Sequence, residues 1–484
     1  MKKIAKYGVM ILALLLLYVH FDTSAGLQLP ENNRKLRNYN IDFNLVAEEA
    51  IPILQALLRT DTTRKNEKKI TRYFARILKR NGISSQSYEA ARGRANLLAE
   101  LPAANAGRGL ILTSHLDVVE ADAREWVVPP FSGVIKGGRI YGRGALDMKS
   151  MAVMQLMTML LLKRNNIPLK HKLMFLALAD EESGGELGIQ HLIKNHRSVF
   201  TGYENVLNEG GLGTRGIAIK DKTIFNIQFA GKGTFWLKVT ASGPSGHGSL
   251  PPTEYASLKL MKFIQRLSSF QDKMIISEHT EKFFYQMGEA SDFPNSYFLK
   301  RSGNPLVQRV LKPVIEGNKH LRAMTRNTVS LTSLNSGNSE GPNVITDRAE
   351  ATLDIRLLPG YSPNEMLLQI NQLAEQYGIK VKVINSAASK ASRINNHLFN
   401  SIARVVQVNE PSAFITPLLS PASTDSLYMR PINLNCYGFM PIVVTAEELA
   451  GLHGKNENIS IENFKRGLKM MFEVVLAYNE LYAN

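Results

Sequence analysis

The sequence predicts an α/β fold with a mainly parallel central sheet, split by an inserted ferredoxin-like α+β domain. In its first half, short apolar runs alternate with segments of helical spacing, as expected where helices connect parallel strands. From about residue 233 the order becomes strand, helix, strand, strand, helix, strand, which is the ferredoxin-like unit. After residue 388 the first pattern resumes. We therefore expect a split α/β domain over 36–232 and 388–484 and a smaller domain inserted over 233–387, called the lid below.

The elements of the split α/β domain follow from the spacing of its apolar residues. Helical spacing predicts helices over 45–60, 70–80, 151–162 and 188–195. Unbroken apolar runs predict buried strands over 109–113, 172–179 and 205–208. Because open parallel sheets carry their sites at the carboxyl ends of the strands, the residues after these runs are the first candidates for chemistry.

The elements of the lid are predicted in the same way. Strands are expected over 234–242, 328–334, 343–358 and 380–385, and helices over 255–267 and 364–377. Residues 270–326 form an insertion within the lid, to which the sequence assigns no role.

Composition excludes several classes of protein. Of the 484 residues, 44% are hydrophobic and 21% are charged, which excludes a mostly disordered or low-complexity chain. The net charge is +16, but the basic residues are scattered and form no dense patch, so we expect no nucleic-acid partner. The single cysteine, Cys436, excludes an intrachain disulfide and a cysteine-rich zinc finger.

Residues 1–26 are typical of a signal peptide or a membrane anchor. Lys2, Lys3 and Lys6 precede the apolar run Val9–Val19, and the small residues Thr23–Ala25 follow it. That run has 11 residues, fewer than the roughly 20 that span a bilayer, which favours a cleaved signal. We therefore expect a secreted or periplasmic protein. The alternative is that this segment stays as a membrane anchor, and we expect no other contact between the protein and a membrane.

The first strand predicted above ends at Ser114-His115-Leu116-Asp117. Residues two apart on an extended chain face the same side, so Asp117 can accept from one ring nitrogen of His115. The other nitrogen is then free to bind a metal. Taken alone, a hydrogen-bonded structural histidine explains this pair better.

The second strand is followed by three adjacent carboxylates, Asp180-Glu181-Glu182. Such a run repels itself unless water or a cation neutralises it, and in isolation a solvated loop is the simpler explanation. Because consecutive side chains point apart, Glu181 and Glu182 cannot share one role. One can bind a metal while the other acts as a base.

Three more candidates lie on other loops. Glu209 follows the third strand, beside two glycines that permit close approach. Asp147 directly precedes the helix over 151–162, where capping of that helix is the alternative. His453 lies in the second half of the split domain.

Together these loops supply two histidines and three carboxylates without any cysteine: His115, Asp147, Glu182, Glu209 and His453. Nitrogen and carboxylate ligands suit zinc, and also cobalt or manganese. Five ligands are too many for one tetrahedral zinc, whereas two ions about 3.5–4 Å apart can share a bridging carboxylate. The set therefore predicts a two-metal site.

The ordered series of these motifs resembles the M20 family of metallopeptidases. It comprises Ser114–Asp117, Gly142–Lys149, Asp180–Gly184, Asn208–Gly211 and His453–Glu457. Chain length, the N-terminal apolar segment and Trp126–Gly133 are most similar to the carboxypeptidase S and N-acyl-amino-acid hydrolase branch. The resemblance runs from about residue 45 to the C-terminus. It implies a zinc-peptidase-like catalytic domain with an inserted lid that dimerises, in agreement with the split organisation.

The resemblance also implies roles for individual residues. Asp147 would bridge two Zn²⁺ ions per subunit, with Co²⁺ or Mn²⁺ as alternatives. His115 and Glu209 would complete one metal site, and Glu182 and His453 the other. Glu181 would be the general base, and Asp117 would orient His115.

Substrate contacts are implied for four residues. His247 resembles the family's lid histidine, which reaches the site, often from the partner subunit, and donates to the oxyanion; a plain turn is the alternative. Arg356 resembles the arginine that holds a substrate carboxylate, with a structural salt bridge as the alternative. Asn343 would hydrogen-bond the same end of the substrate. Thr424 belongs to a segment that resembles the family's pocket loop.

We therefore expect a hydrolase that cuts the amide bond before a C-terminal amino acid in peptides or N-acyl amino acids. A fatty N-acyl-amino-acid hydrolase or synthase, which needs an apolar channel, is one alternative. A catalytically silent binding protein is another, although it would have no use for Glu181. The run Gly337–Gly341 matches a serine nucleophile elbow around Ser339, but that chemistry needs a strand-to-helix turn. Strands are predicted on both sides here, so we expect a hairpin loop.

Overall fold

The computed structural model of the chain describes residues 37–481 except 64, 104, 270–272 and 338–340. The predicted signal or anchor over 1–26 lies outside the described residues. Among the helices that are described, none has the length and apolar character needed to cross a bilayer.

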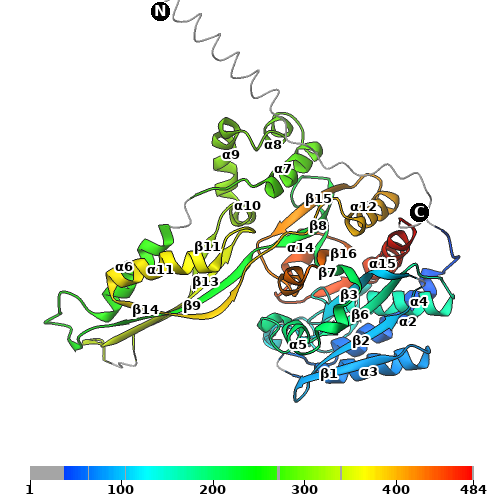
Figure 1. The fold of residues 1–484 in the computed structure, drawn as a ribbon, viewed down its shortest axis with the longest axis horizontal. Helices are drawn as coiled ribbons and strands as arrows, with labels where there is room; N and C mark the ends of the chain where they lie inside the picture. The colour runs from blue at the N-terminus through cyan, green and yellow to red at the C-terminus, as the bar shows by residue number, and fades with distance from the viewer. Residues whose placement is uncertain (1–36, 64, 104, 270–272, 338–340, 482–484) are drawn as a thin grey trace, which may run out of the picture.

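The larger part of the molecule is built on an eight-stranded mixed sheet (Figure 1). Its strands are, in spatial order, β1 (Ser85–Ala91), β2 (Arg94–Leu101), β6 (His171–Leu178), β3 (Asn105–His115), β7 (Tyr203–Arg215), β16 (Asn435–Val444), β8 (Thr223–Gly231) and β15 (Phe414–Ser420). The central strands β6, β3, β7 and β16 are parallel. On either side, β2 and β8 run antiparallel to them. The predicted α/β fold with a parallel centre is confirmed.

Helices cover both faces of this sheet. One face packs against α2 (Phe43–Leu58), α3 (Glu67–Arg80), α4 (Lys149–Arg164), α12 (His397–Asn409) and α15 (Ile461–Leu481). The other face packs against α5 (Ile189–Asn195) and α13 (Ser426–Met429). In β3, Leu110 and Leu112 join the first core and Ile111 joins the second, as the period of two in a strand requires. The free thiol of Cys436 is buried in the second core.

The third predicted strand is longer than expected. We predicted it over 205–208, with Glu209 beyond its end, but β7 continues to Arg215 and contains Glu209. The glycines after Glu209 do not end the strand; they let it pass between two neighbours. A Cβ atom on Gly211 would stand 2.0 Å from the carbonyl oxygen of Asn226 in β8. Only glycine fits that approach.

The lid is a four-stranded antiparallel sheet that extends from the main sheet as an arm (Figure 1). Its strands lie in the order β11 (Thr328–Asn335), β13 (Arg348–Leu357), β9 (Gly233–Ser242) and β14 (Ile379–Ala387). Two helices, α6 (Ala256–Ser268) and α11 (Pro363–Tyr377), pack on one face. The chain order is the predicted β-α-β-β-α-β unit.

The strand predicted over 343–358 is divided. β9 ends at Ser242, which pairs with Arg348, so the residues before Arg348 have no partner left on β9. Instead, β12 (Val344–Ile345) pairs with β10 (Gly246–His247) in a separate ribbon. Ser339 of the nucleophile-elbow pattern lies outside the described residues, but the elements on either side of it are strands, as predicted.

The insertion without a predicted role forms four helices: α7 (Glu278–Ala290), α8 (Asn295–Leu299), α9 (Pro305–Gly317) and α10 (Lys319–Met324). They share a small apolar core with Phe284 and Leu311, against which Leu418 of β15 packs. Figure 1 shows this helical group beside the end of β15. The insertion therefore covers an edge strand of the main sheet, which leaves that edge unavailable for pairing.

Candidate metal centre

A small sheet joins two segments that are far apart in the sequence. β5 (Arg139–Tyr141) pairs with β17 (Asn458–Ser460), and β4 (Ile135–Lys136) pairs with β5. Asp147 follows β5 in the chain, and His453 precedes β17. The pairing therefore brings the His453 loop beside the Asp147 loop.

The buried carboxylate of Glu457 fixes these two loops to each other. Its Oε1 accepts from the backbone amides of Leu146 at 2.7 Å and Asp147 at 3.0 Å. Its Oε2 accepts from the Arg143 guanidinium at 2.7 Å, and Arg143 also donates to the carbonyl oxygen of Gly454. Each donor would otherwise be buried and unsatisfied, so Glu457 sets the geometry of the whole segment.

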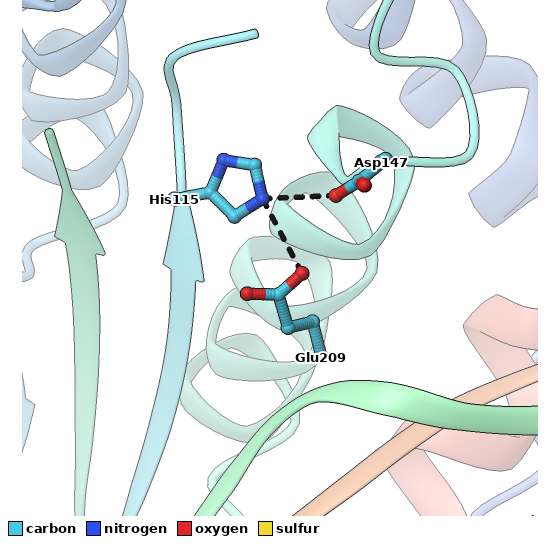
Figure 2. Close-up of side chains that lie close together, drawn as sticks. All are labelled: His115, Asp147 and Glu209. Carbon is cyan, nitrogen blue, oxygen red and sulfur yellow. Dashed lines mark hydrogen bonds and ion pairs between the residues drawn. The ribbon is translucent and has the colours of Figure 1, made fainter. Parts of the chain in front are cut away.

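Three of the predicted ligands form one group at the end of β3. Figure 2 shows the His115 ring facing the carboxylates of Asp147 and Glu209. His115 Nε2 lies 2.9 Å from Asp147 Oδ1 and 3.4 Å from Glu209 Oε2. His115 is buried.

Asp147 also belongs to a second group. Its other oxygen, Oδ2, lies 3.0 Å from His453 Nε2, and His453 Nε2 lies 3.3 Å from Glu182 Oε1. The ligand atoms of each group fall within 4.8 Å of one another. Asp147 thus presents one oxygen to each group. It does not cap α4, because the N-cap position there is Met148.

Asp117 holds a different contact from the one predicted. The acceptor for His115 Nδ1 is the backbone carbonyl oxygen of Asp117 at 2.9 Å, while its carboxylate stands 3.6 Å away. That carboxylate instead accepts from the backbone amides of Glu181 and Glu182, both at 3.1 Å. The prediction of a carboxylate–histidine pair is therefore corrected. Asp117 thus orients the His115 ring through its backbone carbonyl and the turn with Glu181 and Glu182 through its carboxylate.

A buried ion pair supports the other side of that turn. Asp180, which precedes Glu181, has a left-handed φ of 73°. Its Oδ1 binds Arg94 Nη2 at 2.7 Å, and its Oδ2 accepts from the Leu187 amide at 2.9 Å. Arg94 Nε in turn lies 2.8 Å from the fully buried Glu67. The strained backbone of Asp180 is thus held by Arg94 at one carboxylate oxygen and by the Leu187 amide at the other.

The electrostatics of the site favour a bound cation. Burial, followed by the charge of Glu209, raises the pKa of Glu181 well above its usual range. Burial also raises the pKa of Glu209 to about 7. The buried Oε1 atoms of Glu182 and Glu209 accept no hydrogen bond of acceptable geometry from the described residues. Clustered carboxylates with unused lone pairs beside two imidazoles are a donor set that fits Zn²⁺.

A pocket of about 470 Å³ opens over these groups. Glu181, Glu182 and His453 line it, together with Arg356 from the lid strand β13 and Thr424 from the loop before α13. Arg356 Nε lies 2.7 Å from Asp354, and Arg356 Nη1 donates to Ser423 at 2.7 Å. Both predicted alternatives for Arg356, a structural ion pair and a position in the pocket, therefore describe it.

His247 and Asn343 are not brought to this pocket within one chain. They hydrogen-bond each other, with Asn343 Nδ2 3.1 Å from His247 Nε2, and both are exposed. Thr234, near the start of β9, lines the pocket. Ser242, at the other end of β9, is about 27 Å from Thr234 along an extended strand, and His247 lies beyond Ser242. Within one chain, Asn343 therefore lies away from Arg356 and the pocket.

Comparison with known proteins identifies the family. Residues 111–477 match peptidase family M20/M25/M40.

The chain belongs to peptidase family M20/M25/M40.

Its M20 relatives differ in what their names say they act on. The chain is 29% identical to the mouse (Mus musculus) N-fatty-acyl-amino acid synthase/hydrolase PM20D1, over 75% of this chain and 73% of that protein. It is 27% identical to the probable carboxypeptidase S-like 2 of Dictyostelium discoideum, over 76% of this chain and 71% of that protein. In fold it matches the M20 metallo-carboxypeptidase Sso-CP2 of Sulfolobus solfataricus with a TM-score of 0.68 at 18% identity, over 89% of this chain and 99% of that one. This M20 chain is thus a metallopeptidase or amidohydrolase.

Three residues of the M20 site went unassigned in the sequence. Glu457 lies in the motif His453–Glu457, but nothing in its spacing shows that it accepts hydrogen bonds from backbone amides. Arg94 is distant in the chain from the turn it supports. Asp425 is buried beside the pocket, and its Oδ1 accepts no hydrogen bond from the described residues. In the sequence, the position of Asp425 directly after Thr424, in a run of small residues, indicates that it lies near the pocket.

Proposed function

We propose that the protein is a dizinc amidohydrolase of carboxypeptidase type, which hydrolyses the amide bond before a C-terminal amino acid in peptides or N-acyl amino acids. The observation that carries this proposal is the placement of Asp147, whose two oxygens lie 2.9 Å and 3.0 Å from two different histidines. A carboxylate placed in this way can bridge two ions.

The residues that would hold the ions follow from the two groups. His115 and Glu209 would bind one Zn²⁺, Glu182 and His453 would bind the other, and Asp147 would bind both. Co²⁺ or Mn²⁺ fits the same donor atoms. When bound, zinc supplies a water whose pKa is lowered to about 7 and a Lewis acid for the carbonyl oxygen.

Glu181 would move the proton. It lines the pocket beside Glu182, and its amide is held by Asp117. Its carboxylate would take a proton from the attacking water and deliver it to the nitrogen of the leaving amine. The products are then the free amine of the amino acid and the carboxylate of the acyl part.

Arg356 and Thr424 would select a substrate that ends in a carboxylate. The Arg356 guanidinium is half-buried on the pocket wall and fixed by Asp354 and Ser423. A fixed guanidinium is pre-organised for a planar carboxylate. The names of the relatives, an N-fatty-acyl-amino acid synthase/hydrolase and a carboxypeptidase, support substrates of this kind.

His247 and Asn343 would act from the partner subunit. Their distance from the pocket of their own chain means that a second copy must supply them if they reach a substrate. We therefore propose a homodimer formed through the lid, with domain boundaries at 36–232, 233–387 and 388–484. Secretion or export to the periplasm, with or without an N-terminal anchor, is part of the same proposal.

The decisive experiment compares substrates and one variant. Zinc-loaded enzyme should release the amino acid from an N-acyl amino acid or a Gly-Xaa dipeptide and should leave the corresponding amino-acid amide intact. Glu181→Gln should lower kcat by about 10²–10⁴-fold. The matched control is Glu462→Gln, an exposed glutamate that does not line the pocket. A silent binding protein would bind these compounds without turnover, and full activity of Glu181→Gln would contradict the assignment.

A further inference from the structure

A second cavity, of about 680 Å³, lies beside the catalytic pocket. Its walls are α5, α13 and the segment 387–390 that leads from the lid back to the main sheet. It is larger than the catalytic pocket, whose volume is about 470 Å³. Its size is in the range of cavities that hold small organic ligands.

The two cavities share a boundary. Leu427 and Tyr428 line both of them. Two walls of the second cavity also continue directly from catalytic loops: α5 follows the loop of Glu181 and Glu182, and α13 follows Thr424. The two cavities are therefore neighbours, and a ligand that occupied both would lie against Leu427 and Tyr428.

The lining of the second cavity is mostly apolar. Eight of its 14 lining residues are apolar or aromatic, among them Leu187, Ile193, Ala388 and Ile432. The charged members, such as Lys194 and Lys390, are exposed and can stay in water. The cavity therefore favours an apolar chain over a peptide, since every further peptide unit would bring an amide that needs hydrogen-bond partners.

We propose that this cavity is the acyl-chain subsite, which takes the hydrocarbon tail of a long-chain N-acyl amino acid past Leu427 and Tyr428. This assignment rests on the proposed amidohydrolase function, and it selects the fatty-acyl substrate over the peptide. Hydrolysis would then leave the amino acid in the catalytic pocket and the fatty acid in the second cavity.

The test fills the cavity without touching the catalytic pocket. Ala388 is exposed and lines only the second of the two cavities, so Ala388→Trp adds a large side chain there. The matched control is Ser386→Trp, two residues earlier in β14, exposed and lining neither cavity. The readout is the ratio of kcat/KM for an N-dodecanoyl amino acid to that for the N-acetyl compound. This ratio should fall about tenfold or more in Ala388→Trp and stay at the wild-type value in Ser386→Trp.

A binding measurement distinguishes an error in the subsite assignment from an error in the proposed reaction. Calorimetric titration with the N-dodecanoyl amino acid should show an affinity that falls about tenfold in Ala388→Trp, whether or not the compound is turned over. Binding without turnover would overturn the proposed function and support the subsite. An unchanged kcat/KM ratio with unchanged affinity, or an equal loss in both Trp variants, would overturn the subsite alone.

Discussion

Asp147 Oδ2 and His453 Nε2 lie 3.0 Å apart, although one residue precedes α4 and the other is near the C-terminal end of the chain. The β5–β17 pairing and the carboxylate of Glu457 produce this contact. Without it, the two candidate metal groups would not share a ligand. The predictions below test the contacts that hold this arrangement.

Glu457→Ala should destabilise the protein and weaken zinc retention. The change leaves the Arg143 guanidinium buried without its carboxylate and leaves the amides of Leu146 and Asp147 without an acceptor. We expect a loss of about 3–5 kcal/mol in the free energy of unfolding, measured by denaturant titration. The control is Glu462→Ala at an exposed site. Equal stability of the two variants would refute the role given to Glu457.

Asp117→Asn should lower kcat by about 10–100-fold while zinc content stays full. Asparagine replaces one of the two carboxylate oxygens by an NH2 group, so one of the amides of Glu181 and Glu182 would face a donor instead of its acceptor. His115 keeps its partner because that partner is a backbone carbonyl. Steady-state kinetics with metal analysis checks both parts, and Asp122→Asn in an exposed turn is the control. Loss of zinc without a change in kcat per bound metal would favour the carboxylate–histidine pair instead.

Glu67 should make stability depend on pH. Burial raises its pKa to about 7; Arg94 lowers the pKa, and Asp117 and Asp180 raise it. A raised pKa means that the folded state binds the proton more tightly than the unfolded state. The stability that Glu67 contributes is therefore present below pH 4.5 and is lost as the pH rises to about 7.

The measurement is the free energy of unfolding of wild type and Glu67→Gln at pH 5 and pH 8. Relative to the variant, wild type should lose about 1–3 kcal/mol between these two values, because each pKa unit corresponds to about 1.4 kcal/mol. A constant difference across this range would show that the proton of Glu67 is not coupled to folding.

Two inactive variants should restore activity when mixed. If His247 acts from the partner subunit, Glu181→Gln and His247→Ala each remove a different half of every site. A dimer with one copy of each variant keeps one site intact, so random exchange should recover roughly a quarter of wild-type activity. The rate of amino-acid release after mixing measures this. A mixture that stays inactive after proven subunit exchange would contradict the lid dimer.

The sequence predicted the parts of the site that depend on sheet order. His115 and the turn with Glu181 and Glu182 follow apolar runs, and carboxyl ends of neighbouring parallel strands meet at one edge. The structure brings all five predicted ligands into two groups that share Asp147. Glu209 was placed correctly in space although its strand was predicted too short, because glycines in a strand can mark either its end or a close approach.

The remaining contacts could not be read from local patterns. A spacing of two residues puts Asp117 beside His115, but it does not decide whether the carboxylate or the carbonyl oxygen accepts. Strand prediction located His247 and Asn343 on the lid without fixing the direction in which the lid extends. The second cavity needs α5, α13 and the end of β14 together, and these come from three distant parts of the chain.

The most direct test of the account is a crystal structure of the zinc-loaded protein with anomalous scattering measured at the zinc edge. We predict two peaks about 3.5–4 Å apart on either side of the Asp147 carboxylate, one beside His115 and Glu209 and the other beside Glu182 and His453. A single peak, or two peaks that do not share Asp147, would contradict the dizinc centre.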